Sequence, residues 1–260
     1  MITDIRESII TRLHQIEAEH KVEILYAVES GSRAWGFEST DSDYDVRLIY
    51  RHELKWYLNV LPKRDVIEYP ESNLLDISGW DLRKTLFLLN KSNPVLFEWL
   101  NSPIVYIKNE ASYNLIKEAS EDYFSPISSI YHYLHMAKGN YRNYLQGDIV
   151  RIKKYFYVLR PLLACMWIEK YSKTPRLNFQ DLIKELEIGE QLLNSIAVLL
   201  KDKKTGIESG YGPKIPEINN FIQNKIEHFT EKSSSFNPAD KPSPVKLDEL
   251  FFTLINLNSM

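Results

Sequence analysis

Two acidic residues separated by one position, Asp43 and Asp45, carry the clearest potential for chemistry in this sequence. They open an apolar run with the alternation of a strand. We therefore expect both carboxylates on one face, with Tyr44, Val46 and Leu48 on the other. Neighbouring carboxylates repel each other, and a bound divalent cation removes that cost. Ligands that are all oxygen suit Mg²⁺, with Mn²⁺ as the alternative, so the pair predicts a metal site.

A Gly-Ser turn lies ten residues before the carboxylate pair and has the composition of a phosphate-binding loop. Gly31 lets the backbone approach a phosphate closely, and exposed amides together with the Ser32 hydroxyl can donate hydrogen bonds to its oxygens. Arg33 follows, and its planar guanidinium matches the geometry of phosphate oxygens. An ion pair of Arg33 with Glu38 or Asp41 is the alternative interpretation.

A third carboxylate is expected near the pair, because a two-metal site is seldom held by two carboxylates alone. Asp76 is our choice, since it lies inside the apolar run 74–77, where an unpaired carboxylate would be costly to bury. Glu68, in the preceding expected strand, is the rival. A salt bridge between Asp76 and a Lys or Arg side chain is the structural alternative. We therefore expect Asp43, Asp45 and Asp76 to be both metal ligands and catalytic residues.

The Gly-Ser turn, the ten-residue spacer and the Asp-x-Asp pair together resemble the signature of the DNA polymerase β superfamily of nucleotidyltransferases. Residues 31–37, 42–46 and 75–82 resemble one branch in particular, the predicted nucleotidyltransferases of RNA-repair gene clusters. The resemblance implies transfer of a nucleoside monophosphate from an NTP, such as ATP, or a dNTP to a hydroxyl acceptor, with release of pyrophosphate. An RNA end is the implied acceptor. Transfer to a small molecule or a protein side chain, and nucleotide sensing without catalysis, stay open as alternatives.

Hydrophobic periodicity predicts an α+β fold with two domains. The expected strands cover residues 22–28, 44–50, 65–69, 74–80 and 104–107. The expected helices of the tail cover residues 109–121, 126–145, 148–170, 178–186, 189–202, 215–232 and 246–258. We therefore expect a nucleotidyltransferase domain at 1–108, with a small mixed, palm-like sheet, and an all-helical domain at 109–260 that closes the active-site cleft.

The expected helical tail carries a basic cluster. Between His132 and Arg160 a single acidic residue, Asp148, accompanies six basic residues: Lys138, Arg142, Arg151, Lys153, Lys154 and Arg160. Helical spacing places Lys153, Tyr157 and Arg160 on one face, which we expect to meet phosphates and bases. The resemblance supports Lys154 and Arg160, which fall in the Lys-x5-Arg-Pro stretch of the branch. The nucleotide-binding residues expected here are Lys154, Tyr157 and Arg160, and an ordinary solvated basic face is the alternative.

Composition limits the class of protein further. The chain has 260 residues and a formal net charge of −3, which argues against a surface coated with nucleic acid but permits a local groove. Its one cysteine, Cys165, fits a reducing compartment, and the first residues mix acidic and basic groups, unlike a signal peptide. The longest apolar run, 161–168, is far shorter than the ~20 residues that span a bilayer. We expect a cytoplasmic protein without a membrane partner. The sequence does not specify the base, the sugar or the oligomeric state.

Overall fold

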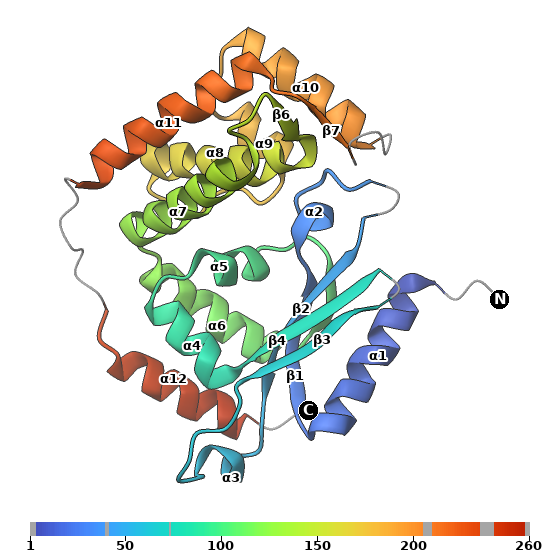
Figure 1. The fold of residues 1–260 in the computed structure, drawn as a ribbon. Helices are drawn as coiled ribbons and strands as arrows, with labels where there is room; N and C mark the ends of the chain where they lie inside the picture. Colours follow the sequence, from blue (N-terminus) through green and yellow to red (C-terminus); the bar gives the residue numbers. More distant parts are fainter. Residues whose placement is uncertain (1–3, 40–41, 73, 205–209, 235–241, 258–260) are drawn as a thin grey trace. The chain divides into compact units, whose positions relative to one another are not determined.

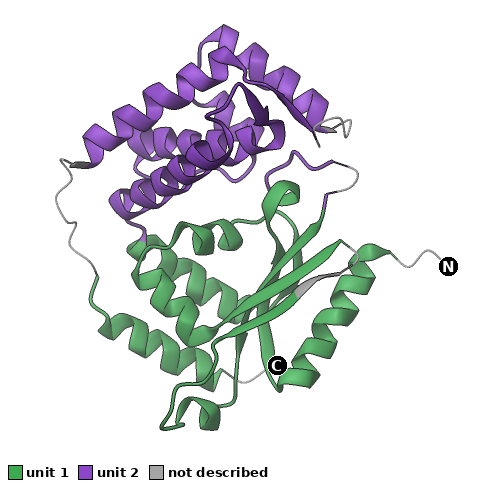
Figure 2. Ribbon diagram, in the orientation of Figure 1, with its two compact units in different colours: residues 1–34, 43–123, 241–260 green, residues 35–42, 124–240 purple. Residues whose placement is uncertain are grey.

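The computed structural model describes residues 4–39, 42–72, 74–204, 210–234 and 242–257 (Figure 1). The chain divides into two compact units (Figure 2). Unit 1 comprises residues 1–34, 43–123 and 241–260, and unit 2 comprises residues 35–42 and 124–240. Asp41, considered above as a possible ion-pair partner of Arg33, lies outside the described residues.

Unit 1 is built on a five-stranded mixed sheet with the strand order β3-β4-β2-β1-β5. The strands are β1 (Glu23–Glu29), β2 (Tyr44–Arg51), β3 (Val66–Ser72), β4 (Leu75–Asp81) and β5 (Val105–Lys108). Strands β2 and β4 run parallel, whereas β1 pairs antiparallel with β2 and β5, and β3 pairs antiparallel with β4. Because β2 and β4 are parallel neighbours, their first residues lie next to each other at the same end of the sheet. The expected fold class, α+β with a small mixed sheet followed by helices, is confirmed.

Helix α1 (Ile5–His20) covers one face of this sheet. Its fully buried Ile9 and Leu13 belong to one apolar cluster with Val46 and Leu48 of β2. Tyr44 packs against the same cluster. The alternation predicted for this strand is therefore confirmed, and the odd-numbered residues of β2 are directed to the opposite face.

The opposite face of the sheet is covered by helices that follow β4 and β5. They are α4 (Leu82–Asn90), α5 (Pro94–Leu100) and α6 (Glu110–Tyr123), and α12 (Val245–Asn256) packs beside α4 and α6. The rings of Trp80 and Trp99 stack with centroids 3.8 Å apart, which joins β4 to α5. Asp81 caps α4, as its side chain accepts a hydrogen bond of 2.8 Å from the Arg83 amide. These contacts fix the orientation of β4.

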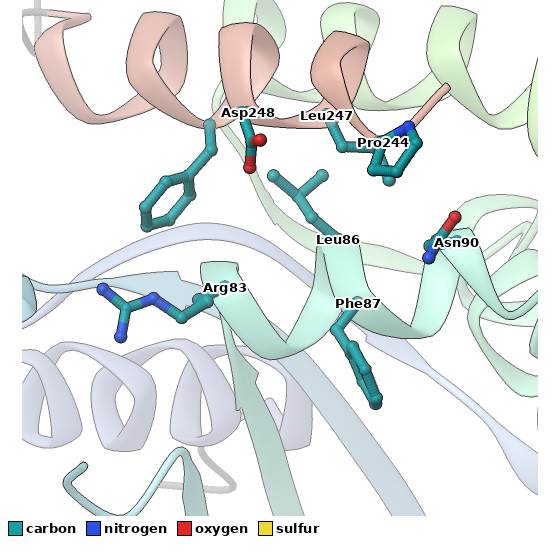
Figure 3. A pocket seen from close by; sticks show the side chains of 8 residues that line it. Arg83, Leu86, Phe87, Asn90, Pro244, Leu247 and Asp248 are labelled. Carbon is teal, nitrogen blue, oxygen red and sulfur yellow. The ribbon is translucent and has the colours of Figure 1, made fainter. Parts of the chain in front are cut away.

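Helices α4 and α12 leave a pocket between them (Figure 3). Its lining is mainly apolar and consists of Arg83, Leu86, Phe87, Asn90, Pro244, Leu247, Asp248 and Phe251. Because α4 begins where β4 ends, this pocket lies beyond the end of β4, whereas Asp76 lies near the start of that strand. None of the expected site residues lines this pocket.

Unit 2 is mostly helical. Its elements are α7 (Pro126–Tyr144), β6 (Ile149–Arg151), the 3-10 helix η1 (Ile152–Tyr155), α8 (Phe156–Tyr171), α9 (Phe179–Lys184), α10 (Glu190–Lys204), β7 (Tyr211–Pro213) and α11 (Pro216–Ser234). The helix expected at 148–170 begins only at Phe156, because β6 pairs antiparallel with β7. This two-stranded pairing is the departure from an all-helical tail.

The two compact units have different boundaries from the expected domains. Helix α6 groups with the sheet, where Tyr113 packs on Tyr26 with ring centroids 4.8 Å apart. Residues 35–42 group with unit 2, where Phe37 stacks on Phe156 at 4.8 Å. The boundary at residue 108 and the closing of a cleft by the tail stay predictions. Among the described helices, none has the length and apolar character needed to cross a bilayer.

Candidate active site

The carboxylates of Asp45 and Asp76 lie side by side on the sheet. The two residues are register partners across the parallel pair of β2 and β4, with side chains 30% and 36% exposed. Asp43 comes directly before β2. Burial is the largest cause that raises the pKa of Asp45; Arg47 opposes it, and the charges of Asp76 and Asp43 add to it. The three expected carboxylates are therefore close enough for the charges of Asp43 and Asp76 to act on Asp45.

The rival third ligand, Glu68, lies elsewhere on the sheet. It pairs in register with Ser78, not with the position of Asp76, and its side chain is 58% exposed in an ion pair with Arg64. The pairing of β2 with β4 thus favours Asp76 as the carboxylate closest to Asp45.

The Gly-Ser turn lies directly beside Asp45. Gly31 begins the one-turn helix α2 (Gly31–Ala34) with a φ of +60°, and a Cβ placed there would come within 2.0 Å of Oδ2 of Asp45. The Ser30 amide donates a 2.8 Å hydrogen bond to the Asp45 carbonyl. Ser32 is half-buried at this turn. Only glycine allows the loop backbone to approach the carboxylate this closely, so the predicted loop lies in direct contact with Asp45, one of the predicted carboxylates.

Arg33 is held at the same place by the backbone and by a ring. Its Nε donates a 3.1 Å hydrogen bond to the carbonyl oxygen of Asp43, and its guanidinium carbon lies 3.7 Å from the centroid of the Tyr44 ring. The arrangement places a positive charge beside the turn that contains Gly31.

Arg47 is a site residue that the sequence analysis missed. Its Nη2 donates hydrogen bonds of 2.9 Å to Oδ1 of Asp45 and 2.7 Å to Oδ2 of Asp76. Its Nη1 donates to the backbone carbonyls of Val46, at 3.0 Å, and Asp76, at 3.1 Å. The salt bridge considered as an alternative for Asp76 therefore exists, and it includes Asp45. The period-2 pattern that groups Asp43 with Asp45 also places Arg47 on that face.

Glu29, at the end of β1, is the second missed residue. It is fully buried, and its Oε1 accepts a 2.8 Å hydrogen bond from the backbone amide of Asp45. The Tyr106 hydroxyl donates to its other carboxylate oxygen. Burial raises the pKa of the Glu29 carboxyl, while the bonds from Tyr106 and the Asp45 amide oppose the rise. Glu29 thus fixes the backbone that carries Asp45.

These residues fit a metal ion that takes some of its ligands from outside the protein. Mg²⁺ in proteins is commonly held by one or two carboxylates, with water and substrate phosphates completing its coordination. Asp45 and Asp76 offer such a pair, and the backbone of Gly31 packs against Oδ2 of Asp45, where a Cβ would clash. Within the described part of the chain, no three His, Cys, Asp or Glu side chains form a metal-binding cluster by themselves. In this structure the Arg47 guanidinium forms ion pairs with both carboxylates.

In unit 2, Lys154 lies between two tyrosine rings. Its ammonium is 4.5 Å from the ring centroids of both Tyr144 and Tyr157, and both rings are exposed. Burial lowers the pKa of Lys154, and the charges of Arg151 and Lys153 add to the effect. The arrangement combines positive charge with accessible aromatic faces, as in proteins that bind single-stranded nucleic acids.

Arg160 does not share an exposed face with Lys153 and Tyr157. It is 3% exposed, and its guanidinium carbon lies 4.5 Å from the centroid of the Trp35 ring. Lys153 lies in η1, before α8 begins, so α-helical spacing does not relate it to Tyr157 and Arg160, which both lie in α8. The expected basic face is thus divided into an exposed part around Lys154 and Tyr157 and a buried part at Arg160.

Comparison with known proteins places the chain in a family. The family model of the RNA repair pathway DNA polymerase beta family, RlaP, matches residues 5–253. An uncharacterized protein of Bacillus subtilis (strain 168), YcgL, is 46% identical over 250 residues, which are 96% of each chain. A solved nucleotidyltransferase-like protein from Exiguobacterium sibiricum is 13% identical, with a TM-score of 0.30 over 86% of this chain and 79% of that one. The family match extends from α1 to α12, so the chain belongs to the RNA repair pathway DNA polymerase beta family.

Proposed function

We propose that this protein is a metal-dependent nucleotidyltransferase that transfers a nucleoside monophosphate from an NTP or dNTP to the hydroxyl group of an RNA end. Membership of the family supports nucleotidyl transfer in general. The observation that carries the proposal is the in-register pairing of Asp45 with Asp76 directly beside the backbone of Gly31. Such an arrangement serves a ligand that combines a divalent cation with phosphate groups.

Carboxylates would hold the metal. Asp45 and Asp76 would each supply an oxygen from neighbouring strands. Asp43, directly before β2, would join them only when the ion is bound, because the three side chains, all within the described residues, do not form a metal-binding cluster in its absence. Mg²⁺ bound there would neutralise the triphosphate and lower the pKa of the acceptor hydroxyl. Glu29 would keep Asp45 in position through the bond to its amide.

The turn would bind the triphosphate. Gly31 would admit phosphate oxygens to the backbone amides, and Ser32 would donate from its hydroxyl. Arg33, positioned by Asp43 and Tyr44, would supply charge-assisted hydrogen bonds to the β- or γ-phosphate.

The transfer step involves one bond formed and one bond broken. The acceptor hydroxyl oxygen attacks the α-phosphorus, and a new P–O bond forms. The bond from the α-phosphorus to the oxygen bridging to the β-phosphate breaks, and its electron pair leaves with pyrophosphate. The proton of the acceptor hydroxyl passes to the nearest site carboxylate, which acts as general base.

Unit 2 would bind the nucleic acid strand through Lys154 and Tyr157. The exposed rings of Tyr144 and Tyr157 offer stacking surfaces for bases, and Lys154 offers charge to a phosphate. The burial of Arg160 beneath Trp35 favours a supporting role for Arg160, which would hold that ring in place.

A direct test incubates the protein with each labelled NTP and dNTP, Mg²⁺ or Mn²⁺, and RNAs that differ in their 3′ and 5′ ends. We expect labelled RNA and an equal amount of pyrophosphate with at least one combination, and neither product with Asp76→Asn. Tight nucleotide binding without pyrophosphate release would indicate a sensor instead. Pyrophosphate release without labelled RNA would move the acceptor to another class of molecule.

A further inference from the structure

The guanidinium of Arg47 forms ion pairs with both carboxylates of the pair and offsets one of their two negative charges. The side chain is only 17% exposed, and one of its nitrogens, Nη2, donates to both Asp45 and Asp76. Nη1 donates to two backbone carbonyls, so hydrogen bonds hold both terminal nitrogens of the guanidinium. Arg47 is therefore built into the sheet beside the carboxylates.

A metal ion and this guanidinium compete for the same oxygens. A divalent ion bound between Oδ1 of Asp45 and Oδ2 of Asp76 would lie at the two oxygens that now accept from Nη2, and therefore next to the guanidinium. Two cations so close together would also repel each other strongly in a partly buried site. Loading of the metal and release of the Nη2 bonds must then occur together.

We propose that Arg47 is a resident counter-cation of the carboxylate pair, and that metal binding displaces its guanidinium from Asp45 and Asp76. This inference rests on the proposed function, because it takes the pair as the metal site. Because the guanidinium has to be displaced, the exchange weakens the binding of Mg²⁺ in the absence of a nucleotide. A nucleotide favours the exchange, because its phosphates bring negative charge that both the ion and the released guanidinium can bind. Arg47 would thus bias the site toward the metal–nucleotide complex over the free metal.

Calorimetric titration of Mn²⁺ into nucleotide-free protein tests this exchange without using activity. Arg47→Gln should bind Mn²⁺ at least about ten- to a hundred-fold more tightly than wild type, the equivalent of one of the two charge-assisted hydrogen bonds that no longer have to break. Arg47→Lys should lie between the two. Arg64→Gln is the matched control, since it removes the same charge from an exposed side chain in the same unit, and it should bind as wild type does.

The outcomes separate this inference from the proposed function. Equal Mn²⁺ affinity in wild type and Arg47→Gln, with binding lost in Asp76→Asn, would overturn the exchange and leave the metal site intact. Weaker binding in Arg47→Gln would also overturn it, because Arg47 would then order the ligands. Failure of every variant to bind Mn²⁺, with or without an NTP, would remove both the exchange and the metal site.

A measurement on the wild-type protein covers the case in which Arg47→Gln does not fold. The ¹⁵N side-chain resonance of Arg47, assigned by its absence in Arg47→Lys, is followed by NMR during titration with diamagnetic Mg²⁺ and an NTP. We expect this resonance to shift as the Nη2 bonds break, while that of Arg64 stays in place. An unchanged Arg47 resonance at saturating Mg²⁺ and NTP would overturn the exchange.

Discussion

Arg47 in unit 1 and Lys154 in unit 2 are both partly buried cations, but different partners hold them. Arg47 donates to two carboxylates on adjacent strands, at 2.9 and 2.7 Å. Lys154 lies over two tyrosine rings, 4.5 Å from each centroid. A carboxylate cancels the charge of its partner, whereas a ring attracts a cation without carrying a net charge of its own.

This difference separates two tasks. The cluster of Asp43, Asp45 and Asp76 concentrates negative charge and suits a cation brought by the substrate. The surroundings of Lys154 keep a positive charge next to exposed rings and suit the anionic backbone of a nucleic acid. The contrast leads to four predictions, from the largest expected effect to the smallest.

Asparagine at Asp45 or Asp76 should have the largest effect. Each change deletes a negative ligand but keeps an oxygen for Arg47, so the fold should persist while the rate of transfer falls by about a hundred- to a thousand-fold or more. Asp43→Asn should behave likewise. Single-turnover transfer at saturating Mg²⁺ measures the effect, with Glu68→Gln as the control near wild type. A damaging Glu68→Gln together with a mild Asp76→Asn would move the third ligand to Glu68.

Arg160→Ala should act on stability. The guanidinium is buried against Trp35, so its loss should lower the free energy of unfolding by about 2–3 kcal/mol through lost cation–π attraction and packing. Urea denaturation followed by circular dichroism measures this, with the exposed Arg142→Ala expected within about 0.5 kcal/mol of wild type. An Arg160→Ala protein of normal stability with a ten-fold weaker NTP affinity would instead return Arg160 to the phosphate-binding surface.

Glu29→Ala should impair transfer roughly ten-fold, as expected when a group that orients a metal ligand is removed. The change leaves the Asp45 amide without its buried acceptor. Glu29→Gln retains an oxygen for this bond and should recover most of the rate. The test compares kcat for the two variants at equal folded fraction. Equal impairment by both would show that the charge of Glu29, and not its acceptor oxygen, is what the site needs.

Lys154→Ala should have the smallest effect and the most specific one. It should weaken binding of single-stranded RNA, and it should reduce the slope of log affinity against log salt by about one, because one phosphate contact is lost. Fluorescence anisotropy at several salt concentrations measures both quantities. Lys173→Ala makes the same charge change at an exposed position of unit 2 and should bind RNA as wild type does. The same salt slope in both variants would remove Lys154 from the RNA surface.

The sequence predicted the strand that carries the carboxylates, and the face they lie on, because these signals are local. Strand periodicity assigned Asp45 to the face opposite Tyr44 and Val46, and the structure agrees. The same periodicity places Arg47 on the face of Asp45. The sequence alone does not tell whether a charged side chain in a half-buried strand pairs with a neighbour or points into solvent. Glu29 gave no comparable signal, since its role depends on the pairing of β1 with β2 and on Tyr106 from β5.

The basic cluster of unit 2 was predicted less well, because its geometry depends on distant pairing. Strands β6 and β7 have three residues each, and Arg151 pairs with Tyr211 across a long intervening segment. Such short strands leave no periodic pattern, so residues 148–155 were predicted to be part of one continuous helix with α8. With the helix begun in the wrong place, the shared face assigned to Lys153 and Arg160 was wrong as well.

The most direct test of the central claim is the position of the metal in a crystal grown with Mn²⁺ and a non-hydrolysable NTP. The anomalous signal of manganese locates the ion without reference to activity. We predict an ion about 2.1 Å from carboxylate oxygens of both Asp45 and Asp76, with a phosphate oxygen completing its coordination. An ion bound elsewhere, or none at all with Arg47 still between the two carboxylates, would contradict the assignment of this pair as the catalytic metal site.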